Sequence, residues 1–167
     1  MTDGPMFDSS VRRVVTAHDS RGRSVVQSDE SFQPVAVAGG EARFALVWTT
    51  AQVPADNMGD TEGAARDAGL TIRNGSVIRI VDFRPGSRSP MHRSYSVDYG
   101  LVVHGQVDLE LDGGEVKHLK AGDIVVQRGT NHLWINPSNT EWSRMAFILI
   151  EAKPVVVDGR VLDDHML

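Results

Sequence analysis

The chain has 167 residues, of which 41% are hydrophobic, so its length suits one structural domain with a sizeable core better than two. It contains no cysteine, which excludes disulfides and thiolate metal ligands and is compatible with a reducing cytosol. The formal net charge of -5 argues against a nucleic-acid partner, and no run approaches the roughly 18 apolar residues of a membrane span. Because residues 1–10 also lack the basic and apolar parts of a signal peptide, we expect a cytoplasmic protein without a membrane partner.

The first 75 residues predict strands and a loop that pack on or extend a later β-domain. Two valine-rich runs flank the turn-forming residues 19–22, so we expect a β-hairpin between residues 11 and 30. Residues 42–50, ARFALVWTT, predict a further strand. Residues 54–75 are polar and glycine-containing, and within them only residues 62–68 favour one or two helical turns. This long segment is either a functional lid or binding loop, or a surface excursion.

A regular all-β pattern begins at Ser76 and continues to residue 152. Short runs of strand-forming residues alternate with turns that contain Gly, Pro or Asn, which is the spacing expected of a β-barrel. Gly113 and Gly114 predict a tight hairpin turn, because glycine readily adopts positive φ. Residues 145–150 are apolar throughout, which indicates burial on both faces. We expect the barrel core over residues 76–152 and a C-terminal tail over residues 153–167.

Two stretches of the expected barrel carry histidines at defined spacing from glycines. The first stretch contains Gly86, His92, Ser94, Asp98 and Gly105, and the second contains Gly122, Gly129, His132 and Asn136. Together they resemble the two conserved motifs of the cupin superfamily, in the same order and separated by a short hairpin. In the second motif, Gln127 stands where the family has proline. The resemblance implies an all-β cupin fold, a double-stranded β-helix or jelly-roll barrel, here with an N-terminal β extension.

Residues 92–100, HRSYSVDYG, also resemble a subgroup of small bacterial and fungal cupins. Fungal members of this subgroup often accompany natural-product biosynthesis genes. Small cupins of this type commonly pair through N-terminal strands, so the resemblance implies a homodimer in which residues 11–29 cover otherwise exposed sheet edges. The subgroup resemblance names no reaction.

Metal-binding cupins hold their ion with two histidines and a glutamate from the first motif and one histidine from the second. Carried over residue by residue, His92 and His132 match motif histidines, Asp98 stands for the glutamate, and Ser94 replaces the remaining histidine. The resemblance therefore implies a divalent ion, Zn(II), Fe(II), Mn(II) or Ni(II), on His92, Asp98 and His132. Because aspartate is shorter than glutamate, Asp98 binds the ion directly or through water. The alternative is a metal-free site in which these groups form a buried hydrogen-bonded network.

Period-two alternation predicts which side chains share a barrel face. His132, Trp134 and Asn136 lie on one face, so Trp134 and Asn136 are candidate substrate-binding residues if His132 points inward. Alternatively, Trp134 is an ordinary core residue. Arg79 shares its face with apolar residues, and a buried guanidinium requires an anion. Arg79 therefore either binds a substrate carboxylate or lies on the outer face in solvent.

Ser94 and Tyr99 are the candidate catalytic residues. Ser94 has the same parity as His92, so its hydroxyl is expected to hold a water or a substrate oxygen near the metal. Tyr99 is expected to donate a proton if it reaches the cavity, and otherwise to pack in the barrel wall.

These expectations favour an enzyme whose substrate is a small, oxygen-rich, carboxylate-bearing metabolite. A metal that polarises a carbonyl or carboxylate beside a proton donor favours redox-neutral chemistry such as dehydration, isomerisation or decarboxylation. A non-haem Fe(II) dioxygenase is one alternative, because a three-ligand site leaves positions for substrate and O2. A non-catalytic cupin that binds a small molecule is the other.

Overall fold

The computed structural model describes residues 8–59 and 62–164, and the predicted N-terminal, loop and C-terminal segments extend beyond these ranges. The described chain is almost entirely β-structure, with two short 3-10 turns, η1 (Ala38–Gly40) and η2 (Gly63–Ala65). The strands are β1 (Val11–His18), β2 (Ser24–Phe32), β3 (Val35–Val37), β4 (Ala42–Thr50), β5 (Ser76–Phe83), β6 (Ser96–His104), β7 (Gln106–Leu111), β8 (Val116–Lys120), β9 (Ile124–Arg128), β10 (His132–Ile135), β11 (Ser143–Glu151), β12 (Val156–Val157) and β13 (Arg160–Val161).

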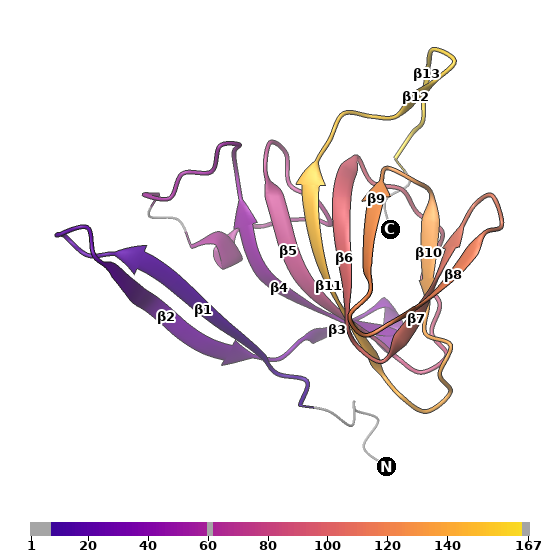
Figure 1. Cartoon of the computed structure of the whole chain (residues 1–167), viewed down its shortest axis with the longest axis horizontal. Helices are drawn as coiled ribbons and strands as arrows, with labels where there is room; N and C mark the ends of the chain where they lie inside the picture. Colours follow the sequence, from indigo (N-terminus) through magenta and orange to yellow (C-terminus); the bar gives the residue numbers. More distant parts are fainter. Residues whose placement is uncertain (1–7, 60–61, 165–167) are drawn as a thin grey trace.

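Two sheets form the barrel (Figure 1). The larger has the strand order β3-β4-β5-β11-β6-β9, and the smaller has the order β10-β7-β8. All pairings between neighbours in these two sheets are antiparallel. Buried apolar side chains from both sheets form one core cluster, which includes Val81, Val102, Val107, Leu109, Trp134 and Met145. The predicted all-β barrel is thereby confirmed.

The final long strand lies in the middle of the larger sheet. β11 pairs with β5 on one side and with β6 on the other, which explains its continuous apolar sequence. Phe147 lies opposite Arg79 in β5 and Gly100 in β6. A Cβ atom at Gly100 would lie 3.1 Å from Cε1 of Phe147 and 3.2 Å from Cε of Met145. The absence of a side chain at residue 100 therefore leaves room for the Phe147 ring inside the barrel.

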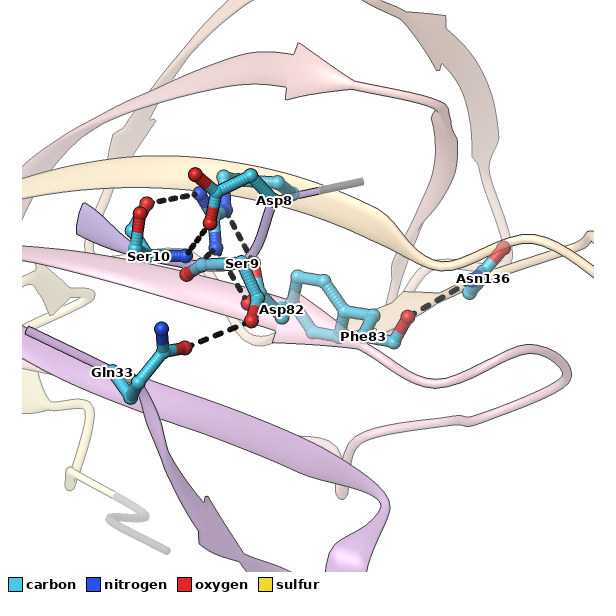
Figure 2. A network of polar contacts seen from close by, with 8 residues as sticks. Asp8, Ser9, Ser10, Gln33, Asp82, Phe83 and Asn136 are labelled. Carbon is cyan, nitrogen blue, oxygen red and sulfur yellow. Dashed lines mark hydrogen bonds and ion pairs between the residues drawn. The ribbon is translucent and has the colours of Figure 1, made fainter. Parts of the chain in front are cut away.

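The predicted N-terminal hairpin is confirmed as β1 and β2, which pair with each other and project from the barrel (Figure 1). The segment just before β1 is hydrogen-bonded to Arg144 of the barrel, which also forms a buried ion pair with Asp82. Nε of Arg144 lies 2.6 Å from Oδ1 of Asp82, and Nη2 of Arg144 donates to the Ser9 carbonyl at 2.6 Å. Figure 2 shows Asp82 beside Ser9 and Ser10 in this network. The network fixes where the hairpin leaves the barrel.

The described parts of the loop over residues 54–75 are bonded to β4 and β5. Thr49 donates its hydroxyl hydrogen to the Gly63 carbonyl at 2.6 Å, and Nη1 of Arg66 donates to the Thr49 carbonyl at 3.0 Å. These contacts attach residues 63 and 66 to β4, while residues 54–59 of the same loop are all exposed. Among the described residues, no helix is long and apolar enough to cross a membrane.

Candidate functional site

The segment after β5 runs beside β10 and brings two histidines together. Backbone hydrogen bonds join N of His92 to the His132 carbonyl at 2.8 Å, and N of His132 to the His92 carbonyl at 2.9 Å. Ser89 reinforces the alignment, because its N donates to the Trp134 carbonyl at 2.9 Å. The two imidazole rings lie 4.3 Å apart between centroids, at 52° to one another. The two motif histidines thus form a rigid pair.

The backbone orients each ring of the pair. Nδ1 of His92 lies 3.0 Å from the Pro90 carbonyl, and Nδ1 of His132 lies 2.9 Å from the Thr130 carbonyl. A carbonyl only accepts hydrogen bonds, so we assign the proton of each neutral ring to Nδ1 and the lone pair to Nε2. Burial lowers the pKa of His132 to about 4, while the Thr130 hydrogen bond acts in the opposite direction and His92 adds to the lowering. His132 is therefore neutral at pH 7, the form that binds metals.

Asp98 belongs to a buried cluster with two serines. Ser96 donates its hydroxyl to Oδ1 of Asp98 at 2.5 Å, Ser94 lies 3.5 Å from Oδ2, and the two serine hydroxyls are 2.7 Å apart. Burial raises the pKa of Asp98, and the hydrogen bonds from Ser96 and Ser94 oppose this rise. Ser94 is buried as expected, with its hydroxyl directed to this cluster.

The residues present fit a divalent ion in part. Imidazole nitrogens such as Nε2 of His92 and Nε2 of neutral His132 are suitable donors for Zn(II), Fe(II), Mn(II) or Ni(II). Within residues 8–59 and 62–164, however, no three His, Asp or Glu side chains gather closely enough to form a metal site. The structure brings His92 and His132 together and holds Asp98 in the serine cluster. Direct coordination by Asp98 stays a prediction.

A cavity of about 310 Å³ lies beside His92. Its wall is mostly apolar and includes Phe44, Val81, Phe83, Trp134, Phe147 and Leu149. The Trp134 ring lies 6.0 Å from the His132 ring and 5.4 Å from the Phe147 ring, in edge-on contacts. Trp134 is therefore both a core residue and a cavity wall, so the two interpretations of this residue from the sequence are compatible.

Arg79 is buried in the wall of the same cavity, with 8% of its surface exposed. The alternative that places it in solvent is therefore wrong. Its Nη2 donates to the carbonyls of Gly69 and Leu70, the latter at 3.0 Å, and its guanidinium lies 5.7 Å from the centre of the Phe44 ring. Burial lowers the pKa of Arg79. Its Nε is buried with no hydrogen-bond partner among the described residues.

The positions of Asn136 and Tyr99 differ from those expected of a substrate-binding residue and a catalytic residue. Both Nδ2 hydrogens of Asn136 are used, by the Phe83 carbonyl at 3.1 Å (Figure 2) and the Glu141 carbonyl at 2.8 Å. Asn136 thus fixes the turn after β10 and has no donor left for a substrate. Tyr99 is 40% exposed on the outer face of β6, because Asp98 before it points inward. The structure does not bring Tyr99 to the cavity.

Sequence reasoning missed two polar residues that face the interior. Ser87 lines the cavity, is 3% exposed, and its hydroxyl has no partner among the described residues. Gln127 is also 3% exposed, and neither polar atom of its amide is bonded. The only sequence signal for Gln127 is its place in the second motif, where the family has proline. No signal distinguishes Ser87 from other serines.

Residues 79–148 match a family model described as "Cupin domain". The chain is 46% identical over 157 residues to the phomopsin biosynthesis cluster protein C' of Diaporthe leptostromiformis, covering 90% of this chain and 83% of that protein. It is 38% identical over 164 residues to the cupin-domain-containing oxidoreductase fogC of Aspergillus ruber, covering 95% of this chain and 81% of that protein.

Among solved structures, the cupin domain of Cnp3 from Schizosaccharomyces pombe is similar, with a TM-score of 0.53 and 10% identity over 84% of this chain and 87% of that one. A Klebsiella pneumoniae protein with a double-stranded β-helix domain has a TM-score of 0.51 and 21% identity, covering 71% of this chain and 84% of that one. These two structures support the fold alone. From the sequence relatives and the family model together, the chain belongs to the cupin family.

Proposed function

We propose that this protein is a metal-dependent cupin enzyme that acts on a small metabolite held in the cavity between its two sheets. The observation that carries the proposal is the pair of His92 and His132 with both Nδ1 atoms on backbone carbonyls, beside a cavity of about 310 Å³. A volume of this size suits a small metabolite. The relatives named as biosynthesis cluster proteins support a role in small-molecule biosynthesis.

His92 and His132 would hold the ion through Nε2, with Asp98 as a further ligand directly or through water. A divalent ion bound there supplies Lewis-acid polarisation of a substrate oxygen. The protein itself fixes the two rings by backbone contacts and keeps His132 neutral by burial. Both properties favour binding, because a ligand histidine must be deprotonated at the nitrogen that binds.

The cavity lining supports a substrate with an apolar body and few polar groups. Trp134 and Phe147 present aromatic surfaces, and an aromatic ring packs favourably against such walls. Arg79 and Ser87 belong to the lining, and their Nε and Oγ atoms are buried without a hydrogen-bond partner among the described residues. The guanidinium suits a carboxylate or a phenolate oxygen. We therefore propose an aromatic or otherwise apolar metabolite that carries a carboxylate, a narrower class than the oxygen-rich one expected from the sequence.

Redox-neutral chemistry is supported by the serine cluster around Asp98. Burial raises the pKa of Asp98, so this carboxyl group holds a proton more readily than a solvated one. The hydroxyl groups of Ser94 and Ser96 lie 2.7 Å apart, and Ser96 donates a hydrogen bond to this carboxyl. In the form of the site in which Asp98 reaches the ion only through water, Asp98 would take the proton-transfer role in place of Tyr99, which lies on the outer face. Dehydration, isomerisation or decarboxylation are compatible with this arrangement.

An oxidoreductase is the second candidate, favoured by the names of relatives. Besides fogC, srdB of Neurospora crassa is named a cupin-domain-containing oxidoreductase, at 36% identity over 157 residues. In this reading, the same histidine pair would serve an Fe(II) ion.

The two candidates differ in their need for oxygen. We would load purified protein with each of Zn(II), Fe(II), Mn(II) and Ni(II), incubate it with a panel of aromatic carboxylates and hydroxy acids in air and under argon, and follow substrate loss by mass spectrometry. Turnover under argon without a change in redox state supports the redox-neutral enzyme. Turnover only in air, with Fe(II), supports the oxidoreductase. Tight ligand binding without turnover by any loaded form would contradict both and indicate a binding protein.

A further inference from the structure

A second cavity lies at one end of the larger sheet, where β6 begins and β9 and β11 end. Its volume is about 230 Å³. It is lined by residues 93–97 at the start of β6, by residues 128 and 129 at the end of β9, and by residues 152–155 after β11. It shares no lining residue with the cavity beside His92. The metabolite proposed for the first cavity therefore does not occupy the second.

The lining of the second cavity is basic. Among the residues that the structure describes, it contains three cationic side chains and no acidic one, and the cations are Arg93, Arg128 and Lys153. The chain as a whole has a formal net charge of -5, so the local charge has the opposite sign. Like charges around one small cavity repel each other, and an anion that enters relieves the repulsion. The lining therefore favours a negatively charged ligand.

Arg93 is held in the wall of the second cavity. Only 12% of its side chain is exposed, and its Nη1 donates to the Asp163 carbonyl at 3.2 Å. Its Nη2 lies 3.8 Å from Oδ2 of Asp112, which is beyond hydrogen-bond distance. The side chain of Asp112 is 55% exposed, so solvent screens this pair. The guanidinium is thus positioned by a neutral carbonyl, and its charge is only weakly compensated.

The other two cations have no ion-pair partner within residues 8–59 and 62–164. Arg128 and Lys153 are both exposed. Glu151 is the acidic residue nearest to Lys153 in the sequence, and one of its carboxylate oxygens accepts a hydrogen bond from N of Asn74 at 2.5 Å. Neither cation is therefore neutralised by a described carboxylate.

Backbone contacts bring the three lining segments together. N of Ala152 donates to the Tyr95 carbonyl at 2.9 Å, which holds the segment after β11 against the start of β6. Arg128 ends β9, which pairs with β6 on the other side. A Cβ atom at Gly129 would lie 2.9 Å from Cγ2 of Val155, so a side chain at residue 129 would obstruct this close approach. The cations therefore come from three segments that are fixed relative to one another.

We propose that the second cavity binds the phosphate group of a small molecule. A phosphate monoester carries about -1.5 to -2 charges at pH 7, so it matches three cations better than a single carboxylate does. A guanidinium donates to two phosphate oxygens at once, and a lysine ammonium adds a point charge. Ser94 and Ser96 also line the cavity, but their hydroxyls already bond each other at 2.7 Å, so the cations supply the recognition. This site is independent of the proposed metal dependence.

The test titrates the full chain, stripped of metal, by calorimetry in a phosphate-free buffer of low ionic strength. The ligands are inorganic phosphate, glycerol 3-phosphate and acetate. The variants are Arg128→Gln, Lys153→Gln and the two combined, with Lys117→Gln as the matched control, because Lys117 is an exposed lysine of β8 outside the cavity. Removal of the metal ensures that phosphate does not bind through an ion on the histidine pair.

We expect saturable binding of one phosphate group per chain, weakened about 10–100-fold in the combined variant by the loss of two charged contacts. Lys117→Gln should bind as the parent does, and acetate should bind more weakly than either phosphate compound. Tighter binding of glycerol 3-phosphate than of inorganic phosphate would indicate an ester as the ligand, and equal binding would indicate that the phosphate group alone is recognised. The melting temperature without ligand should be the same in all variants, because the replaced side chains are exposed.

Three results would overturn the phosphate site. The first is a parent chain that binds neither phosphate compound saturably. The second is acetate binding as tight as that of inorganic phosphate, which would show a general attraction for anions. The third is unchanged phosphate affinity in the combined variant, or an equal loss in Lys117→Gln, since phosphate would then bind elsewhere or only through the overall charge. None of these results bears on metal binding by His92 and His132.

Discussion

His132 is held neutral inside the barrel, and this lowers the stability of the folded protein at low pH. Its pKa in the folded protein is about 4, below the ordinary value of 6.5 that applies in the unfolded chain. Between these values the unfolded state binds more protons, so acid favours unfolding. The contribution of neutral His132 to stability is present above pH 6.5 and is lost as the pH falls towards 4.

We predict that the metal-free protein loses on the order of 3 kcal/mol of stability from this residue between pH 6.5 and pH 4. Urea denaturation at a series of pH values, in the presence of a chelator, measures the effect. The His132→Asn variant serves as the control and should show a flatter dependence over the same range. Equal slopes in the two proteins would show that His132 does not titrate as the structure requires.

At the residue scale, alternation along the strands predicted part of the site. It correctly assigned His132 and Trp134 to one face, since their rings are in contact, 6.0 Å apart between centroids. It could not place Arg79, because β5 carries apolar residues on both faces and the pattern has no polar side. The same alternation places Tyr99 on the outer face, because adjacent residues in a strand point to opposite faces and Asp98 points inward.

At the element scale, the buried pair of Asp82 and Arg144 joins β5, β11 and the segment before β1. Asp82 is fully buried, and Arg144 also donates to the Ser9 carbonyl. Removing the charge of Asp82 leaves the guanidinium of Arg144 buried without its carboxylate, which is strongly destabilising.

Asp82→Asn is therefore expected to lower the free energy of unfolding by about 3–5 kcal/mol, as for other broken buried ion pairs. Urea denaturation monitored by tryptophan fluorescence measures this change. The exposed pair of Arg12 and Asp29 on the hairpin provides the comparison, and Asp29→Asn should change stability little because solvent screens that pair. Similar effects of the two substitutions would contradict the assigned role of Asp82.

The loop over residues 54–75 depends on Arg79 for its attachment at the cavity. The guanidinium of Arg79 donates hydrogen bonds to two consecutive backbone carbonyls, those of Gly69 and Leu70. No other side chain has this donor geometry. Leu70 itself lines the cavity. The sequence could not reveal this attachment, since the partners of Arg79 are backbone atoms in a segment without periodicity.

Replacing Arg79 with methionine should release residues 69 and 70 and increase cleavage of the loop by proteases. We expect at least a several-fold faster limited proteolysis within residues 62–75, with a loss of about 1–3 kcal/mol in stability from the two carbonyls left unpaired. Arg73→Met removes an exposed arginine of the same loop and should leave the cleavage rate unchanged. A rate for Arg79→Met that matches the parent chain would refute the attachment.

At the scale of the whole molecule, motif spacing identified the barrel but not the cavity. The two motifs cover the segment before β6, β6 itself, β9 and β10; His92 lies in that segment, Asp98 in β6 and His132 in β10. The cavity also needs β3, β4 and Leu70, which lie before the motifs and carry no recognisable signature. The C-terminal segment was expected to be a tail, yet it contains the short hairpin of β12 and β13.

We propose that the hairpin of β1 and β2 pairs two copies of the chain. It projects from the barrel (Figure 1) and exposes 49% of Val14 and 62% of Val26, and the register places both on one face. Deletion of residues 1–30 should give monomer or aggregate. Light scattering of the full chain at micromolar concentration should give the mass of a dimer, and Val14→Ser with Val26→Ser should weaken it. A monodisperse full-length monomer would exclude the pairing.

Elemental analysis of the purified protein measures whether His92 and His132 bind a divalent metal ion, as we propose. The protein is incubated in turn with Zn(II), Fe(II), Mn(II) and Ni(II), freed of excess ion, and measured beside His92→Ala, His132→Ala and the outer-face control Tyr99→Phe. The account predicts about one bound ion per chain in the parent and in Tyr99→Phe, and none in either histidine variant, because two imidazoles are needed to hold it. A parent protein that stays metal-free after incubation with all of these ions would contradict the account.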